Sequence, residues 1–167
     1  MTEAMTWLGQ QPDTLFLGQG VAYPGAKMSE SFDGVPAEKR IEMPVAEQLQ
    51  LGISIGLALE GFVPISVFPR INFLLCAMDM LVNHLDKLPI YSDYRPKVII
   101  RTAVGSRQPL DAGPQHTGDF TYALSRMLET VKIRRVHQLR HAEFVDSLKL
   151  YQGAYERSES TLIVVEG

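Results

Sequence analysis

Short apolar runs alternate with longer segments of helical periodicity along almost the whole chain, and this alternation limits the possible folds more than any other feature of the sequence. Parallel strands need a long crossover connection, usually a helix, so the pattern predicts an α/β fold with a parallel sheet and helices on both faces. The strands are expected at 14–20, 62–68, 97–104, 131–139 and 161–166, the helices at 44–60, 72–88, 120–129 and 142–156, and loops at 22–40 and 106–119.

Length and charge place the chain among ordinary globular domains. Its 167 residues fit one domain, 1–167, and the formal net charge of −3 gives no electrostatic reason to bind nucleic acid. The densest basic run, "KIRR" at 132–135, is expected to be a solvated strand edge or loop. No apolar segment approaches the roughly 20 residues that cross a bilayer, so no membrane association is expected. The single cysteine, Cys76, excludes an internal disulfide and fits a reducing cytoplasm.

The helix expected at 44–60 carries one carboxylate near its start and two interior glycines. Glu47 is explained most simply as an acid that favours the positive end of the helix dipole. Gly52 and Gly56 are four residues apart, and each costs the helix about 1 kcal/mol relative to alanine. Such a face allows another backbone to come close, either within this domain or from a second chain, and spacing alone leaves both alternatives open.

Histidines supply the other candidate chemistry. His116 lies in the turn-rich segment "GPQHTGD" (113–119), after an expected strand, where it is placed for substrate contact or proton transfer or is simply a surface residue. His137 and His141 are four residues apart but straddle a predicted strand-to-helix break and have no clear third ligand, so no metal site is expected. His84, in the middle of a predicted helix, is expected to be structural.

Taken together and in order, the motifs "LFLGQGV", "RIEMPVAEQLQLGISIGLALEGFVPISV", "NFLLCAMDMLVNHLDKL", "GPQHTGD" and "LIVVE" resemble a known family. The chain is similar to the pyrimidine-binding domain of thiamine diphosphate enzymes of the transketolase class, and above all to the beta subunit of 2-oxo acid dehydrogenases. The resemblance spans about residues 14 to 166 and implies the thiamine diphosphate-binding fold.

The resemblance also implies roles for individual residues. Glu47 matches the glutamate that hydrogen-bonds the pyrimidine ring of thiamine diphosphate and so promotes its activation, and the apolar neighbours Val45, Leu49 and Leu51 favour its burial. Phe73 matches the aromatic residue that stacks on the aminopyrimidine, although a core phenylalanine is also compatible with that position. His116 matches a histidine that touches substrate or intermediate. Glu47 and His116 are therefore the expected catalytic residues, and Glu47 and Phe73 the expected cofactor contacts.

The family's magnesium and diphosphate motif, "GDG" followed by asparagine, does not occur, and the chain stops at Gly167, where the family's C-terminal domain is expected. The resemblance thus implies that this chain supplies only half of the thiamine diphosphate site. Magnesium and the diphosphate are expected on an alpha-type partner subunit, in a homodimer or heterotetramer whose helices at 44–60 pack across an interface. The implied activity is thiamine-dependent decarboxylation of a 2-oxo acid with acyl or two-carbon transfer. Transketolase-like or synthase-like ketol transfer from a ketose, and a non-catalytic structural subunit, remain as alternatives.

Overall fold

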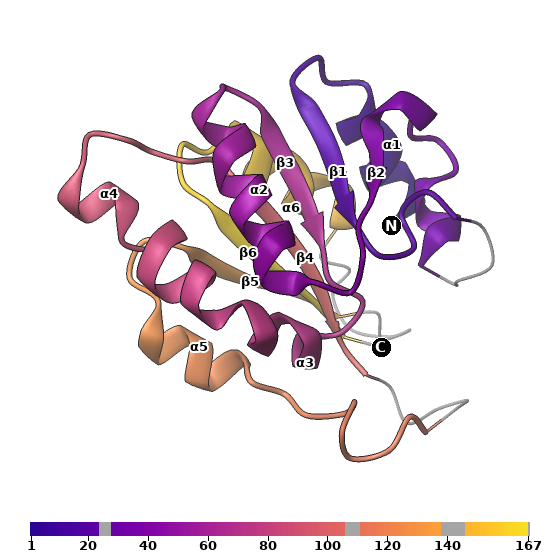
Figure 1. Cartoon of the computed structure of the whole chain (residues 1–167). Helices are drawn as coiled ribbons and strands as arrows, with labels where there is room; N and C mark the ends of the chain where they lie inside the picture. Colours follow the sequence, from indigo (N-terminus) through magenta and orange to yellow (C-terminus); the bar gives the residue numbers. More distant parts are fainter. Residues whose placement is uncertain (24–27, 106–110, 138–145, 167) are drawn as a thin grey trace.

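A single parallel sheet organises the protein (Figure 1). The computed structural model describes residues 1–23, 28–105, 111–137 and 146–166. Within them, six parallel strands are ordered β2-β1-β3-β4-β6-β5. The strands are β1 Thr14–Gly18, β2 Arg40–Glu42, β3 Val63–Val67, β4 Ile99–Val104, β5 Lys132–His137 and β6 Thr161–Glu166. The predicted fold class is confirmed, and the basic run at 132–135 lies on an edge strand, as expected.

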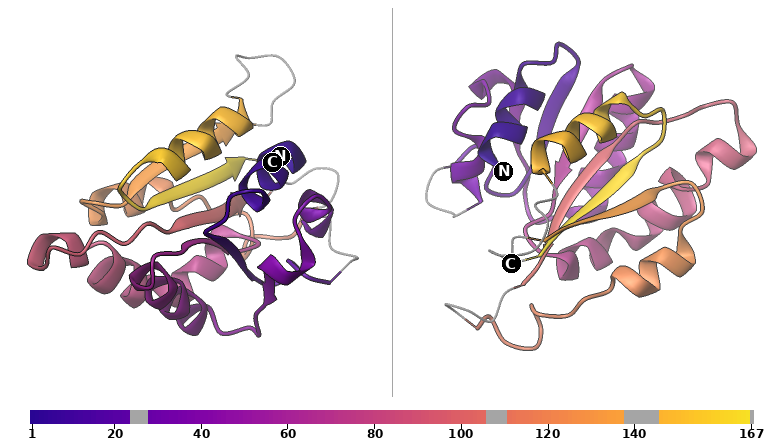
Figure 2. Two further views of the ribbon diagram at one scale, coloured as in Figure 1. Left: turned by 90° about the horizontal axis from the view of Figure 1, so that it is seen from above. Right: turned by 180° about the vertical axis from the view of Figure 1, so that it is seen from behind.

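Helices cover both faces of the sheet (Figure 2). One face packs against three elements: α1 (Thr2–Gly9), α6 (Ser147–Glu156) and the short 3-10 helix η1 (Ser29–Phe32). Alternate residues of the strands fill the core on this side, with Phe16, Ile65, Ile99 and Ile163 packed against Met5, Leu8, Phe32 and Tyr151. A second 3-10 helix, η2 (Ala37–Lys39), leads into β2.

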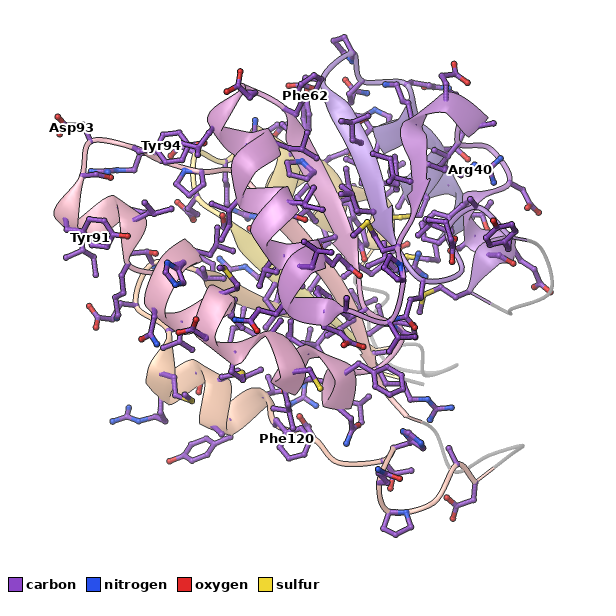
Figure 3. The ribbon with its side chains drawn as sticks, viewed as in Figure 1. Arg40, Phe62, Tyr91, Asp93, Tyr94 and Phe120 are labelled. Atoms are coloured by element: carbon purple, nitrogen blue, oxygen red, sulfur yellow. The ribbon has the colours of Figure 1, made fainter. Side chains whose placement is uncertain are left out.

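The opposite face carries the remaining helices, which form the front layer of Figure 1. They are α2 Glu47–Leu59, α3 Ile71–Leu74, η3 Leu75–Ala77, η4 Met80–Leu85, α4 Leu88–Tyr91 and α5 Thr121–Met127. Their apolar faces bury Leu51, Leu74, Leu81, Leu85 and Leu124 against Ile100, Leu162 and Val164. Figure 3 shows Phe62 and Phe120 at opposite ends of this layer. Within the described ranges, no helix is long and apolar enough to cross a membrane.

Several elements differ from the sequence-based expectation, and η1 and η2 lie in the segment 22–40 that was expected to be a loop. The helix predicted over 72–88 is a succession of α, 3-10 and π turns rather than one regular α-helix. In its π segment the N–H of Asp86 donates to the carbonyl of Leu81, five residues back. The Asp86 carboxylate also ties this segment to the chain before β5. The strand β2 was not predicted, since three residues are too few to show a period and only pairing with β1 defines them.

Candidate active site

The sequence-predicted residues gather where the parallel strands end. Ligands of such sheets bind beyond the carboxyl ends of the strands. Gln19 follows β1, Glu47 follows β2, Arg70 to Phe73 follow β3, and His116 lies on the segment after β4. The fold therefore brings residues that are far apart in the chain to one edge of the sheet.

Glu47 is the first residue of α2 and only 8% exposed. The Nε2 of Gln19 donates a hydrogen bond to Glu47 Oε1 at 3.3 Å. The expectation that apolar neighbours bury this carboxyl was wrong in part: Val45 is 80% exposed and Leu49 is 53% exposed. The contact with Gln19 instead shows that Glu47 faces the turn after β1.

A second carboxylate fixes this turn. Glu42, the last residue of β2, accepts hydrogen bonds from the N–H groups of Gly20 at 2.6 Å and Ala22 at 2.8 Å. The turn also approaches β3 closely, because a Cβ on Gly18 would lie 2.3 Å from the carbonyl oxygen of Val67. Two charge-assisted bonds and a glycine contact thus hold the position from which Gln19 reaches Glu47.

Phe73 and His116 form the other half of the site. Their ring centroids are 5.5 Å apart at an interplanar angle of 63°, an edge-to-face pair. Nη1 of Arg70 donates to the carbonyl of His116 at 3.4 Å. Gly105 makes this approach possible, since a Cβ there would lie 2.1 Å from the same carbonyl oxygen. Aromatic, imidazole and guanidinium groups therefore meet at the ends of β3 and β4.

Two polar atoms here are buried without a partner. Nδ1 of His116 and Oδ1 of Asn72 have no hydrogen bond, although buried polar groups are nearly always paired. Unpaired polar atoms beside a half-exposed aromatic ring, together with the buried Glu47 carboxyl, fit a planar ligand that carries amino and ring-nitrogen groups. The aminopyrimidine of thiamine diphosphate has that chemistry, so the residues fit this cofactor.

Sequence reasoning missed Gln19, Arg70 and Asn72 as site residues. Gln19 stands in the "LGQ" that ends the first strand, which was a usable signal. Arg70 and Asn72 lie within three residues of Phe73 but belong to no periodic pattern. Only the structure shows that the segment carrying His116 contacts Arg70 and that Oδ1 of Asn72 is buried without a partner.

The structure does not join all candidates into one cluster. No hydrogen bond, ion pair or ring contact links Glu47 to Phe73 or His116 in the part of the chain described. His84 is half-exposed, and its Nε2 lies 3.5 Å from Oδ2 of Asp79. His141 lies outside the described residues, and the described ones contain no group of three or more His, Cys, Asp or Glu side chains able to hold a metal.

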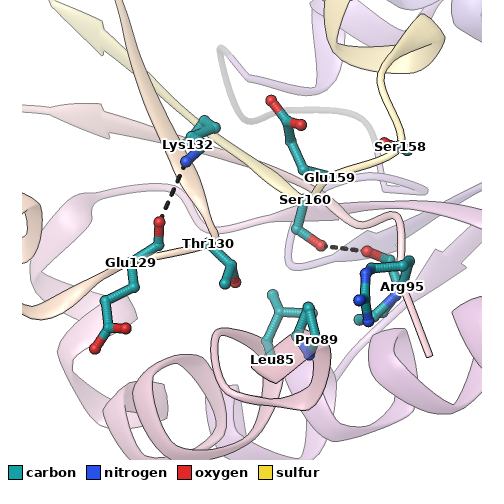
Figure 4. A pocket seen from close by; sticks show the side chains of 10 residues that line it. Leu85, Pro89, Arg95, Glu129, Thr130, Lys132, Ser158, Glu159 and Ser160 are labelled. Atoms are coloured by element: carbon teal, nitrogen blue, oxygen red, sulfur yellow. Dashed lines mark hydrogen bonds between the residues drawn. The ribbon is translucent and has the colours of Figure 1, made fainter. Parts of the chain in front are cut away.

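A pocket of about 340 Å³ lies at the opposite, amino-terminal end of β5 and β6 (Figure 4). Two of its polar side chains already have partners: Lys132 donates to the carbonyl of Glu129, and Ser160 donates to that of Pro96. Because it lies away from the carboxyl ends of the strands, this pocket is not part of the candidate site.

Comparisons with known proteins agree with the motifs. No family model matches the chain. The mitochondrial pyruvate dehydrogenase E1 component subunit beta of Saccharomyces cerevisiae is 32% identical over 119 residues, which cover 68% of this chain and 32% of that subunit. The 3-methyl-2-oxobutanoate dehydrogenase subunit beta of Mycobacterium tuberculosis is 37% identical over 76 residues, 44% of this chain and 22% of that protein. This chain thus matches about a third or less of the length of these relatives.

Solved structures give the same fold over the full length. A structure described as a split gene transketolase, an inactive beta4 tetramer, has a TM-score of 0.74 at 21% identity and covers 99% of this chain and 48% of that one. Transketolase from Campylobacter jejuni has a TM-score of 0.75 at 16% identity, covering 98% of this chain and 24% of that one. The relatives are enzyme subunits, and the chain has the α/β fold of the transketolases.

Proposed function

We propose that this chain, a homologue of 2-oxo acid dehydrogenase beta subunits with the transketolase fold, is the pyrimidine-binding half of a thiamine diphosphate enzyme that acts on 2-oxo acids. The observation that carries the proposal is the shared edge of the sheet, where a buried carboxyl at Glu47 accompanies the Phe73–His116 pair. Thiamine diphosphate, when bound, supplies the carbon nucleophile that attacks a substrate carbonyl.

Glu47 is the proposed proton-handling residue. Its Oε1 accepts a hydrogen bond from Gln19, which leaves Oε2 for the ring nitrogen of the pyrimidine. The bonds from Gly20 and Ala22 to Glu42 keep the Gln19 turn in place, so Glu47 is held in one orientation. A group held in this way transfers a proton without first reorganising its surroundings.

Phe73 and His116 are proposed to contact the pyrimidine and the substrate. The half-buried Phe73 ring is the group proposed to stack on the pyrimidine, and its edge contact with His116 orients the imidazole. The unpaired Nδ1 of His116 is then the atom that meets a polar group of cofactor or substrate.

Arg70 supports an anionic substrate. Its guanidinium has one long hydrogen bond, to the carbonyl of His116, and no ion pair with a carboxylate of the described residues. Arginine binds a carboxylate through two parallel N–H groups. A 2-oxo acid carries its carboxylate next to the reacting carbonyl, which suits a cation beside His116.

Arg70→Gln is expected to lower kcat/KM for 2-oxo acids by about 10- to 100-fold, because a charged hydrogen bond contributes about 1.5–3 kcal/mol. The effect is expected mainly in KM, and Arg70→Lys is expected to recover part of it. Steady-state kinetics of the reconstituted enzyme measures this, with the exposed Arg95→Gln as matched control. A variant with unchanged KM would remove Arg70 from substrate binding.

Ketol transfer is the second candidate reaction. It is favoured by the full-length match to a chain from a split gene transketolase, a protein encoded in separate parts. Comparing turnover of 2-oxo acids with that of ketose phosphates separates the two reactions. A non-catalytic structural role predicts neither activity, although it gives no reason to retain Glu47 and Phe73 together.

The partner is proposed to be an alpha-type subunit that binds the diphosphate and magnesium, in a heterotetramer or with a homodimer of this chain. The exposed face of α2 supports an interface. Leu49 is 53% exposed and Ile53 is 38% exposed. A Cβ on Gly56 would meet nothing within 4 Å, and one on Gly52 only the end of Met80 at 3.8 Å. Packing within this chain therefore does not require the glycines. Close approach of another chain to α2 would explain why they are present.

The single thiol, Cys76, fits a cytoplasmic location.

Gly56→Leu is expected to weaken subunit association by roughly 5- to 150-fold, because overpacking a close helix contact costs about 1–3 kcal/mol. The isolated chain is expected to remain folded, since space around this position is open. Analytical ultracentrifugation measures association and circular dichroism measures the fold. The matched control is Gly153→Leu in α6, a glycine within a helix on the other face. Equal association constants for wild type and Gly56→Leu would argue against an α2 interface.

The proposed function is tested by copurifying this chain with a partner that carries the "GDG…N" motif. Thiamine diphosphate and magnesium are then titrated by calorimetry into the pair and into each chain alone. Tight binding by the pair only, followed by turnover of a 2-oxo acid, is the expected result. Tight binding by a partner from which this chain is absent, or turnover without it, would contradict the proposal.

A further inference from the structure

Arg101, in the central strand β4, carries a charge that the candidate active site does not use. The residue is 6% exposed and lies on the face covered by α1 and α6. Its Nη1 donates to Oγ of Ser31 at 2.7 Å, and its guanidinium lies 5.1 Å from the centroid of Phe32. Nε is buried without a partner, and no carboxylate of the described residues pairs with the guanidinium.

Tyr151, on α6, presents a second unsatisfied donor on the same face. Its side chain is fully buried and its hydroxyl has no hydrogen-bond partner. Burial raises the pKa of Tyr151 to about 12, against an opposing effect of the nearby Arg101 charge, so the hydroxyl stays protonated. Burial also lowers the pKa of Arg101, but a guanidinium keeps its proton at any ordinary pH. Nε of Arg101 and the hydroxyl of Tyr151 are therefore two buried donors that lack an acceptor.

A buried cation with one neutral hydroxyl partner is unfavourable. Removing a charge from water costs several kcal/mol unless a counter-charge or further hydrogen bonds compensate. The face of Phe32 and the oxygen of Ser31 offset only part of this cost. Nε and Nη2 form the side of the guanidinium that binds two oxygens of one oxyanion.

We propose that Arg101 and Tyr151 bind a small oxyanion, a carboxylate or a phosphate, in a buried site between β4 and α6. Two observations separate this site from the proposed active site. Neighbouring residues of β4 point to opposite faces, so Ile100 packs toward the α2 side while Arg101 packs toward α6. Glu47 and Phe73 begin or lie in helices of that other face. The anion site therefore does not depend on the proposed thiamine diphosphate reaction.

Thermal unfolding of the full chain tests the proposal, with phosphate or acetate added at constant ionic strength against chloride. A saturable rise of the unfolding midpoint is expected, roughly 5–10 °C at a hundredfold excess over Kd. A larger response to phosphate identifies a phosphate site, and a larger response to acetate identifies a carboxylate site. No saturable response to either anion would overturn the proposal.

Variants locate the response. Arg101→Met is expected to abolish the rise of the unfolding midpoint with added anion. Without anion, its unfolding midpoint is expected to be no lower than that of wild type, because an apolar side chain of similar size replaces an uncompensated charge. Arg134→Met is the matched control. Arg134 lies on the same face, with Ile163 of β6 between it and Arg101, and its loss is expected to leave the response intact. Equal responses of Arg101→Met and wild type would contradict the site.

Tyr151→Phe keeps the test decisive if Arg101→Met does not fold. This variant removes one hydroxyl and retains the ring in the core. The Kd for the responding anion, measured by calorimetry, is expected to rise about 10-fold, in keeping with the loss of one hydrogen bond to a charged group. An unchanged Kd would exclude Tyr151 from the site and overturn the proposal in this form.

Discussion

Glu47→Gln is expected to reduce kcat of the reconstituted enzyme by about 10²- to 10⁴-fold, the usual contribution of a positioned acid–base group. Glutamine has nearly the same shape, so α2 and its contact with Gln19 are expected to persist. Its amide cannot take up and release a proton at the position of Oε2. If Glu47→Gln loses turnover but remains folded, the loss is therefore due to the missing proton transfer by the carboxyl.

The measurement is single-turnover kinetics of the complex, with thermal unfolding and calorimetry on the same samples. Glu60→Gln is the matched control, because Glu60 lies at the exposed end of the same helix. The control is expected to retain full activity. If Glu47→Gln turns over at the wild-type rate, the carboxyl has no part in proton transfer. The assembly would then have to activate its cofactor by another group.

Asp86→Ala is expected to destabilise the protein by about 3–5 kcal/mol, the cost of breaking a buried charged network. The Asp86 side chain is inaccessible to solvent, and Oδ1 accepts N–H groups of Glu129, Thr130 and Val131 at 3.0, 2.8 and 2.9 Å. Lys87 adds an ion pair at 3.1 Å. Removing the carboxylate leaves these backbone donors without an acceptor and detaches the π segment from the start of β5.

The loss of stability caused by Asp86→Ala is expected to depend on pH. Burial alone would raise the pKa of Asp86, but the N–H groups of Val131, Glu129 and Thr130 and the Lys87 ammonium outweigh it and lower the pKa below 3.8. A lowered pKa gives stability that is complete above the unfolded value and is lost as pH falls through the folded one. The difference in stability between wild type and Asp86→Ala should therefore be largest near neutral pH and shrink below about pH 4.

Urea denaturation at pH 7 and at pH 3.5 measures this prediction. Asp79→Ala is the control: this carboxylate is 54% exposed, and its contacts with His84 and Asn83 lie at the surface. Its effect is expected to stay within about 0.5 kcal/mol. An Asp86→Ala protein as stable as wild type at pH 7 would mean that the network adds nothing to folding.

The spacing of apolar residues along the sequence predicted much of the fold. The runs at 62–68 and 161–166 contain β3 and β6, and the helical segment at 44–60 contains α2, because burial of one helix face or of a whole strand imposes a period on neighbouring residues. The same reasoning treated 72–88 as one helix, since a π turn shifts the period by a single residue and leaves most of the pattern intact.

The sequence by itself determined the parallel α/β fold, the family resemblance and the candidates Glu47, Phe73 and His116. These follow from residue order and from periods over a few turns. Only the tertiary structure decided that Gln19 meets Glu47 and that Arg70 approaches His116. It also decided that Arg101 is buried without a counter-charge. Such contacts join residues distant in the chain, and they exist only once strand order and register have set which loops meet at the edge of the sheet.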